Sequence, residues 1–549
     1  MVGSSVTPPL PDWESLSLAE QVAQMVVVRA SGYLFDHQIQ YPIWEPPAAT
    51  LQHWLQDLGV GGVILLGGSA AEIALRSQQL QDWAQIPLLI AADIEEGVGQ
   101  RFSGATWFPP PMALNAIAQR DLDKALNYAE AMGAYTAQEA LAIGLNWVLA
   151  PTVDVNNNPN NPVINVRAFG ETPKTVSKLA TAFIQGAQRH PVLTAAKHFP
   201  GHGDTATDSH LDLPVLAHSP DRLAALELPP FKSAIAAGVD AVMSAHLQIP
   251  AWDAQFPATL SHRILTQELR QNLGFDGLIV TDALVMGAIA NRYGVNEAPV
   301  LAVEAGADIL LMPLDPAGAI KAVCEAVETG RITPERIQAS VERIWRAKFK
   351  VCSPMPESAD ITHAWENLPP PPIQLEQLSP PEAIATANSI LKDSMQVHFP
   401  LESRLSQPSE SQPLRNVVIV DDALTCDFLG RYTPAIALPQ TKGYQLQLVD
   451  SHTPAISFER PATLQPTLLQ LFIRGNPFRG SAGLTQTAQD WFKFLLGTNQ
   501  LQSLVIYGSP YAVEQFIPQL PADVPYVFTY GQMPAAQAIA LNALLNPQV

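Results

Sequence analysis

The stretch GFDGLIVTDALVMGAI, from Gly274 to Ile289, contains the pattern that is most informative about the fold. It begins with an apolar run that ends at Asp282, and a segment of small and apolar residues follows. A strand without polar alternation is typical of a parallel sheet that helices cover on both faces. The stretch therefore predicts a buried strand with a carboxylate at its carboxyl end.

Runs of this kind recur between Gln24 and Pro313, separated by longer amphipathic segments such as the one from Leu122 to Gly144. There are eight: QMVVV, GGVILL, PLLIAAD, NWVLAP, LTAAKHF, AVMSAHL, GLIVTDAL and DILLMP. Eight strand and helix units predict a closed (β/α)8 barrel of the TIM type. An open doubly wound sheet is the main alternative, and it would favour a glycine-rich phosphate turn. The segment LGVGGVILLGG has neither a GxGxxG nor a Walker spacing, so we expect no dinucleotide site.

Polar residues lie at the carboxyl ends of several of these runs. They are Asp93, Asp154, Lys197 with His198, His246 and Asp282. Because active sites of such barrels are built at the carboxyl ends of the strands, these side chains are the first candidates for a functional site.

A second domain is predicted after the barrel. A charged helix is expected from Thr333 to Lys350, and the proline-rich segment after it cannot continue that helix. We expect a catalytic barrel over residues 1–350, an extended linker over 351–373 and a smaller, sandwich-like α/β domain over 374–549. The strands expected in the second domain are NVVIVDD, LLQLFIRG, SLVIYGSP and PYVFTYG, and its helices are PEAIATANSILKD and AAQAIALNALL. A chain that ends near Lys350 is expected to keep some activity, because every candidate catalytic residue precedes the linker.

Composition excludes several classes of partner. The formal net charge of -20 leaves no surplus of Lys and Arg for nucleic acid or for an anionic membrane surface. The three cysteines, Cys324, Cys352 and Cys426, are too few and too far apart for a disulfide framework or a zinc site. The first residues lack a basic and then apolar leader pattern, and no apolar run approaches the roughly 18 residues of a membrane span. We therefore expect a cytoplasmic protein, and the sequence leaves its oligomeric state open.

A loop rich in titratable groups follows one of the strands. The segment KHFPGHGDTATDSHLDLP, from Lys197 to Pro214, holds three histidines, three aspartates and one lysine. We expect no metal and no other cofactor there, since the loop is glycine-rich and no HxH pair ends the first strand. Taken alone, the segment also fits a solvated surface loop, and Asp282 alone also fits a cap of the next helix. Two carboxylates at strand ends together with this loop favour a catalytic site.

The segment PTVDVNNNPNNP begins like a calcium-binding loop, with Asp154, Asn156 and Asn158 at alternating positions. It has Pro159 where such a loop requires glycine and Asn165 where it requires glutamate. An Asx-rich turn that closes a strand is therefore the prediction.

Two motifs together, KHFPGHGDTATDSH and GFDGLIVTDALVMGAI, resemble the β-N-acetylglucosaminidase branch of glycoside hydrolase family 3. The similarity continues through LSLAEQVAQMVVV, DIEEGVGQRF, LAPTVDVNNNPNNPVINVRAFG and PATLSHRILTQELRQNLGF, and so covers most of residues 16–350. The C-terminal segment is loosely similar to the α/β sandwich that often follows the barrel in this family.

The resemblance implies a role for each matching residue. Asp282 corresponds to the nucleophile and His210 to the acid and base, with Asp208 as its partner. The residues expected to bind the sugar are Asp93, Arg167, Lys197 and His198, and His246 at its strand end is a further candidate. Where the family usually has GGR after the glutamate, this chain has Glu96, Gly97 and Val98, so an arginine expected near the substrate is missing at this point. Gly201 and Gly203 are expected to let the histidine loop move.

The physical chemistry of the residues agrees with these roles. Retaining glycosidases need a nucleophile and a proton donor about 5 Å apart. A histidine with an ordinary pKa of about 6.5 next to a carboxylate serves as that donor near neutral pH. The resemblance implies an exo-acting β-N-acetylhexosaminidase that releases terminal N-acetylglucosamine (GlcNAc) from cell-wall (peptidoglycan) fragments through a covalent glycosyl-enzyme. A family-3 β-glucosidase and a catalytically silent sugar-binding protein are the alternatives.

Overall fold

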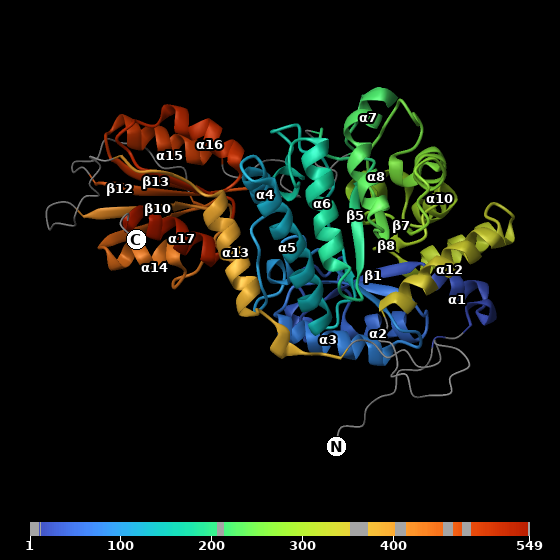
Figure 1. The fold of residues 1–549 in the computed structure, drawn as a ribbon. Coiled ribbons are helices and arrows are strands. Elements are labelled where there is room, and N and C mark those ends of the chain that lie inside the picture. Colours follow the sequence, from blue (N-terminus) through green and yellow to red (C-terminus); the bar gives the residue numbers. More distant parts are fainter. Residues whose placement is uncertain are drawn as a thin grey trace, which may run out of the picture.

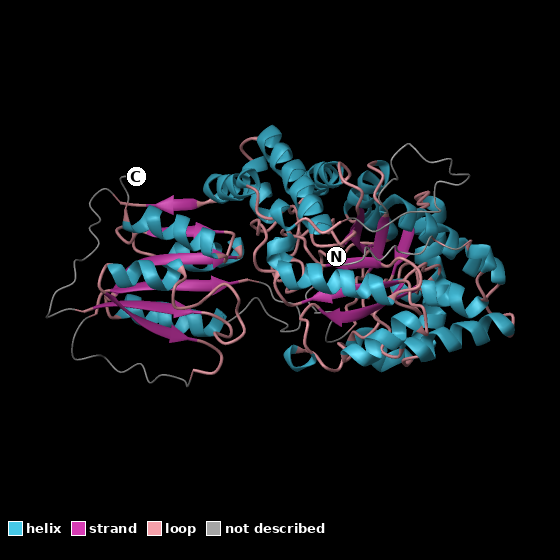
Figure 2. Ribbon diagram, turned by 90° about the horizontal axis from the view of Figure 1, so that it is seen from below, coloured by secondary structure: helices cyan, strands magenta, loops and turns pink. Residues whose placement is uncertain are grey.

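The structure is a computed structural model that describes residues 10, 12–205, 213–351, 372–400, 413–453, 465–474 and 485–546. These residues form two sheets, each surrounded by helices (Figures 1 and 2). The linker predicted over 351–373 lies outside the described residues except for 351, 372 and 373, so the domain boundaries stay a prediction.

The first sheet is a barrel of eight parallel strands. Its order is β7-β6-β5-β4-β3-β2-β1-β8, and a parallel bridge between Val280 and Ile309 joins its two ends. The strands are β1 Val26–Ser31, β2 Gly62–Leu66, β3 Leu89–Ala92, β4 Trp147–Val148, β5 Leu193–Phe199, β6 Ala241–Ser244, β7 Leu278–Val280 and β8 Leu310–Leu311. Each of the eight predicted runs supplies one strand, which confirms the (β/α)8 fold class.

Helices cover the outside of this barrel. They are α1 Leu18–Gln24, α2 Ala48–Gln56, α3 Ala70–Trp83, α4 Met112–Ala118, α5 Leu122–Ala142, α6 Pro173–Ala187, α7 Pro220–Leu226, α8 Leu228–Ala236, α9 Gly287–Tyr293, α10 Glu297–Ala305, α11 Pro316–Glu328 and α12 Pro334–Val351, with a π-helix at Arg263–Asn272. Local sequence sets several of their ends. For example, Ser69 and Glu72 form a reciprocal capping box that begins α3.

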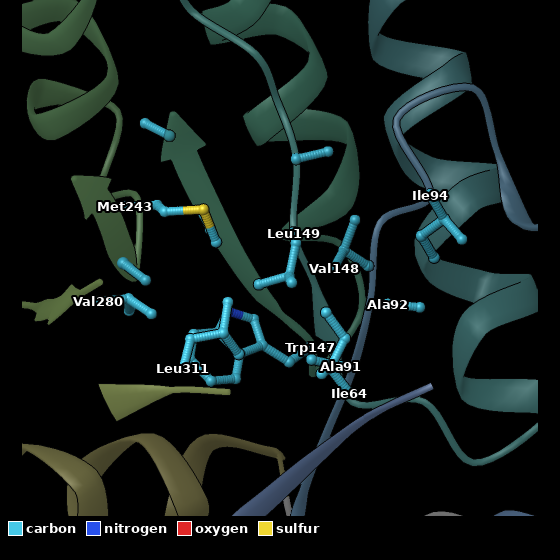
Figure 3. Close-up of a cluster of buried hydrophobic side chains, with 14 of the residues drawn as sticks. Ile64, Ala91, Ala92, Ile94, Trp147, Val148, Leu149, Met243, Val280 and Leu311 are labelled. Carbon is cyan, nitrogen blue, oxygen red and sulfur yellow. The ribbon is translucent and has the colours of Figure 1, made fainter. Parts of the chain in front are cut away.

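Large apolar side chains fill the inside of the barrel. Trp147 on β4 is fully buried and lies in a cluster with Ile64, Leu311, Met243 and Val280 from other strands (Figure 3). A packed interior of this kind leaves no pore through the barrel, so its chemistry must take place at the carboxyl rim, where the loops follow the strands.

The second sheet has the order β11-β10-β12-β13-β14-β9, and only the pair β14 and β9 is antiparallel. Its strands are β9 Gln396–His398, β10 Leu414–Ile419, β11 Tyr444–Val449, β12 Thr467–Ile473, β13 Leu501–Gly508 and β14 Tyr526–Thr529. Figure 1 shows helices α15 Thr485–Gly497 and α16 Pro510–Phe516 over one face, and α14 Pro434–Thr441 and α17 Pro534–Leu545 over the other. The four predicted strands and both predicted helices are present, which confirms a second α/β domain, whereas β9 and β11 were not predicted.

The two domains are in direct contact. Helix α13 (Pro381–Ser394) packs on α4 and α5 of the barrel, and the Lys124 ammonium lies 2.6 Å from the Asp393 carboxylate. Within the described residues, no helix is both long and apolar enough to cross a lipid bilayer.

Candidate active site

Four charged side chains form a continuous network at the carboxyl rim of the barrel. The Nζ atom of Lys197, near the end of β5, lies 2.6 Å from Asp93 Oδ1 and 2.7 Å from Glu95 Oε1, both just after β3. Arg167 donates to the same Glu95 carboxylate through Nε (2.8 Å) and Nη2 (2.7 Å). The structure thus brings together Asp93, Arg167 and Lys197, which the sequence predicted, and adds Glu95.

Burial and charge together set the ionisation of this network. Lys197 is 1% exposed and Glu95 is 4% exposed, and burial alone would favour their neutral forms. The attraction of Arg167 and Lys197 overcomes that effect and holds the pKa of Glu95 well below its usual value. For Lys197, burial opposes the charged form, but Asp93 and Glu95 raise its pKa. The network is therefore ionised throughout the physiological pH range.

Asp93 is the member of this network that reaches solvent, with 37% of its side chain exposed. Its pKa is lowered against the effect of burial by Lys197 and then by Arg101. Its carboxylate therefore stays ionised at the mouth of the barrel, where it can accept hydrogen bonds from a polyhydroxylated ligand.

An arginine does lie beside the network, although the sequence analysis missed it. Arg101 Nε donates to the Asp93 carbonyl oxygen at 3.0 Å. Val98, the residue at the position of the missing family arginine, is fully buried. The arginine in GQRF, eight residues after Asp93, was the signal in the sequence that could have identified it.

A second network centres on Asp154, in the segment after β4. Its buried carboxylate accepts from the backbone N–H groups of His198 (3.1 and 3.2 Å) and His202 (2.6 Å) and lies 2.8 Å from His198 Nδ1. This contact favours the His198 tautomer with its proton on Nδ1 and turns Nε2 away from Asp154. Asp154 therefore positions the start of the histidine loop.

His202 is buried, and its environment favours the neutral form of its imidazole. Burial lowers its pKa to about 4, although the Asp154 carboxylate opposes this shift. Its Nδ1 lies 2.8 Å from Thr205 Oγ1. His202 is therefore neutral near pH 7.

Close packing holds the first part of the histidine loop. A Cβ atom at Gly203 would lie 1.8 Å from the Val155 carbonyl oxygen. The Asn161 amide donates to the carbonyl oxygens of His202 (2.8 Å) and Gly203 (2.9 Å), while its own oxygen accepts from the N–H groups of Val163 and Ile164. The predicted Asx-rich turn is present, and Gly203 here serves close backbone approach rather than movement.

Asp282 lies directly after β7 and is partly exposed. Its Oδ1 accepts from the Ala283 N–H at 2.7 Å, and its charge acts on the pKa of His202 in the adjacent network. His246 is fully buried, with Nδ1 2.8 Å from Thr259 Oγ1 and Nε2 3.0 Å from the Ala283 carbonyl oxygen. The structure therefore places His246 against the backbone that carries Asp282, and its role in sugar binding stays a prediction.

Two predicted catalytic residues, Asp208 and His210, lie outside the described residues. Among the residues that the structure does describe, no group of three His, Cys, Asp or Glu side chains is placed to hold a metal ion.

The chain matches two family models. The glycosyl hydrolase family 3 N-terminal domain matches residues 17–347, and the bacterial glycosyl hydrolase family 3 C-terminal domain matches residues 407–546.

Individual proteins agree with these matches. Beta-hexosaminidase A of Pseudoalteromonas piscicida is 35% identical over 430 residues, which is 70% of each chain. Beta-N-acetylglucosaminidase/beta-glucosidase of Cellulomonas fimi is 32% identical over 308 residues, 54% of each chain. The structure of a family 3 beta-N-acetylglucosaminidase from Paenibacillus sp. str. FPU-7 aligns over 97% of both chains, with a TM-score of 0.73 and 29% identity. The chain therefore belongs to glycoside hydrolase family 3 and is a glycoside hydrolase.

Proposed function

We propose that this protein is an exo-acting β-N-acetylhexosaminidase that removes terminal β-linked GlcNAc through a covalent glycosyl-enzyme. The observation that carries the proposal is the ionised network of Asp93, Lys197, Glu95 and Arg167 on the same rim as Asp282. Similarity to a protein named beta-hexosaminidase A, from Pseudoalteromonas piscicida, and to one named beta-N-acetylglucosaminidase, from Paenibacillus, supports the choice of sugar.

The rim residues have different roles in binding the sugar. The Asp93 carboxylate accepts from sugar hydroxyls, and Lys197 and Arg101 keep it ionised and in place. His198, with its proton held on Nδ1 by Asp154, presents Nε2 to a further hydroxyl group. Because these groups are fixed before the substrate arrives, little reorganisation opposes the reaction.

In the chemical step, an oxygen of Asp282 bonds to the anomeric carbon while the bond to the leaving oxygen breaks. The leaving oxygen takes a proton from the His210 imidazolium, which Asp208 stabilises and orients. The neutral His210 then removes a proton from water, whose oxygen displaces Asp282 and releases the sugar. The Ala283 N–H holds one oxygen of Asp282, and His246 holds the Ala283 carbonyl group, so the nucleophile starts from a fixed position.

The test compares nitrophenyl β-GlcNAc with nitrophenyl β-glucoside, each with and without a chelator. We expect a large preference for the acetamido sugar in kcat/KM and no effect of the chelator. A slow fluorinated glycosyl substrate should label the peptide that contains Asp282, and Asp282→Ala should abolish turnover while the protein stays folded. A label on Asp93 or Asp154 would refute the assignment of the nucleophile.

The acid and base role has its own test. Nitrophenolate departs without a proton, whereas a sugar does not. His210→Ala should therefore slow disaccharide cleavage far more than the first step on the aryl substrate, and the glycosyl-enzyme should accumulate. Asp208→Ala should give a milder form of the same pattern. An equal loss on both substrates would make His210 a binding residue.

A second candidate activity is β-glucoside hydrolysis, because the Cellulomonas fimi relative is named for both activities. Equal rates on the two nitrophenyl sugars would favour it. Peptidoglycan fragments as the source of the sugar and a cytoplasmic location stay predictions, and a digest of purified muropeptides with product analysis tests the first.

A further inference from the structure

Among the contacts that residues of the C-terminal domain make with the rim loops of the barrel, three lie beside the site. Arg474, after β12, pairs with Glu96; Ser509, after β13, donates to Asn165 Oδ1 at 3.0 Å; and the Tyr511 hydroxyl accepts from Asn156 Nδ2 at 2.7 Å. Each barrel partner is one or two positions from a member of the site: Glu96 follows Glu95, Asn156 follows Asp154 by two residues, and Asn165 precedes Arg167 by two. The carboxyl ends of β12 and β13 thus face the rim that carries the site.

The contact between Arg474 and Glu96 is the strongest of the three. The Glu96 side chain is fully buried, and that of Arg474 is 19% exposed. Both guanidinium Nη atoms donate to the carboxylate, with Nη1 3.1 Å from Oε2, and Trp107 Nε1 donates to the same oxygen at 3.0 Å. A planar guanidinium that binds both oxygens fixes the direction as well as the position of the carboxylate.

Glu96 is in turn fixed to the loop that follows β3. Its N–H donates to Gln100 Oε1 at 2.9 Å, and its carbonyl oxygen accepts from the Phe108 N–H at 2.8 Å. Because Glu95 is the preceding residue, any movement of Glu96 also moves the carboxylate that holds Lys197 and Arg167. A buried carboxylate that lost its cation would have to move towards water or take up a proton.

The charges of the local sequence explain why the cation comes from so far away in the chain. Residues 94–100 carry two carboxylates, Glu95 and Glu96, and no lysine or arginine. The next cation along the chain, Arg101, donates through Nε to the Asp93 carbonyl oxygen. Arg474 supplies the positive charge for Glu96 from the other domain.

We propose that Arg474 is a positioning residue for the glycosidase reaction, which it supports through Glu96 by holding the loop of Asp93 and Glu95. The C-terminal domain is then part of the machinery that shapes the sugar site. This reverses the sequence-based expectation that a chain ending near Lys350 keeps some activity. The inference rests on the proposed function, because activity on the GlcNAc glycoside is its main readout.

The experiment uses the full chain and four variants: Arg474→Met, Arg474→Lys, the double variant Glu96→Gln with Arg474→Met, and Lys124→Met. The last is the matched control, since it breaks an ion pair between the same two domains, to Asp393, and Lys124 has no ion pair with Asp93, Glu95, Glu96, Arg167 or Lys197. For each, kcat and KM on nitrophenyl β-GlcNAc and the thermal unfolding midpoint are measured.

We expect Arg474→Met to lose about 100-fold in kcat/KM, because small displacements of positioned groups have effects of this size. The kcat/KM of Lys124→Met should stay within about twofold of the wild-type value, since exposed ion pairs contribute little free energy. The double variant should recover at least about tenfold over Arg474→Met, because a neutral amide at residue 96 needs no cation and still accepts from Trp107. Arg474→Lys should fall between Arg474→Met and the wild type.

Two results would overturn the proposal: wild-type kcat/KM in Arg474→Met, or a double variant no more active than Arg474→Met. The second would show that the loss does not pass through Glu96. If Arg474→Met does not fold, Arg474→Lys is used in its place. A kcat/KM of Arg474→Lys equal to that of Lys124→Met would then overturn the proposal. A wild-type enzyme inactive on the GlcNAc glycoside would instead refute the proposed function, and so the two failures are distinguishable.

Discussion

Two lysines, Lys197 and Lys348, are each 1% exposed, and they lie at opposite ends of the barrel. At the carboxyl rim, Lys197 binds two carboxylates. At the amino-terminal floor, the Lys348 ammonium on α12 donates to neutral oxygens: Gln24 Oε1 (2.7 Å), the Gly61 carbonyl (3.1 Å) and the Pro87 carbonyl (2.6 Å).

The two buried lysines have different partners, and we infer different roles from them. Gly61 and Pro87 lie just before β2 and β3, so Lys348 ties the last helix of the barrel to the starts of its first strands. Lys197 instead keeps two carboxylates ionised beside an opening to solvent. We therefore expect charge at the floor to contribute stability and charge at the rim to contribute catalysis.

The same substitution at both lysines gives the sharpest test of this comparison. Lys197→Met should reduce kcat/KM on the GlcNAc glycoside by about 100- to 1,000-fold, because a preorganised charge at the site is lost. The loss of stability should be smaller than at Lys348, since Glu95 keeps Arg167 and Asp93 reaches water. Steady-state kinetics and urea unfolding measure the two effects. A near-normal kcat/KM in Lys197→Met would contradict the expectation that charge at the rim contributes to catalysis.

Lys348→Met should show the opposite pattern. Three acceptors lose a charged donor, so the free energy of unfolding should fall by about 3 kcal/mol. The kcat/KM of the folded protein should stay within about twofold, because Gln24, Gly61 and Pro87, to which Lys348 donates, lie at the floor. A stable but inactive variant would mean that the floor and the rim are coupled.

The two ends should also differ in their response to pH through His202 at the rim. Its pKa falls from 6.5 to about 4 on folding because of burial. The unfolded chain then binds the proton first, so stability is full above pH 6.5 and falls by up to about 3 kcal/mol as the pH drops towards 4. In His202→Gln, this dependence of the stability on pH should be absent from thermal unfolding measured at several pH values. His262→Gln, at an exposed position, should retain it. An unchanged slope in His202→Gln would contradict the assignment.

The smallest effect is expected for an exposed ion pair at the floor. Arg346 Nη1 lies 2.9 Å from Asp276 Oδ2, with side chains 52% and 70% exposed. Arg346→Ala should lower the free energy of unfolding by no more than about 0.5 kcal/mol, since water and salt screen such pairs. A loss above about 1 kcal/mol in urea unfolding would show that burial does not decide which floor charges matter.

The barrel was predictable because its strands are buried on both faces and therefore read as unbroken apolar runs. The run LTAAKHF coincides with β5 residue for residue. Strand β11 was missed because only unbroken apolar runs were taken as strands. Its sequence YQLQLV alternates instead, as is typical of a half-buried strand, and it lies at an edge of the second sheet, where Leu446 and Leu448 are 38% exposed. Strand β9 has three exposed residues, too few for any period to show.

The positions of three candidate residues at the rim could be predicted from the sequence: Asp93 follows β3, Lys197 lies near the end of β5, and Asp282 follows β7 by two residues. Their roles stay predictions. Glu95 was predicted only as an alternative proton donor and not as part of a binding network, and Arg101 was not predicted at all. Both lie in the loop after β3, where position along the chain does not reveal which side chains meet. The pairing of Glu96 with Arg474 spans 378 residues and follows from how the domains pack, which no local pattern encodes. His246 was expected among the sugar-binding residues because of its strand-end position; its contacts with Thr259 and with the Ala283 carbonyl group were not predicted, since they depend on how the loops pack.

The facing ends of the two sheets have a consequence for how the protein is made. Synthesis proceeds from the amino terminus, and domains fold largely in that order. The whole barrel therefore leaves the ribosome before Arg474, Ser509 and Tyr511 have been translated. Until β12 and β13 of the second sheet have been synthesised, the rim loops lack these contacts, and the Glu96 carboxylate lacks the Arg474 cation. In the nascent chain, the rim of the first domain to emerge is thus the last part of that domain to reach its final form.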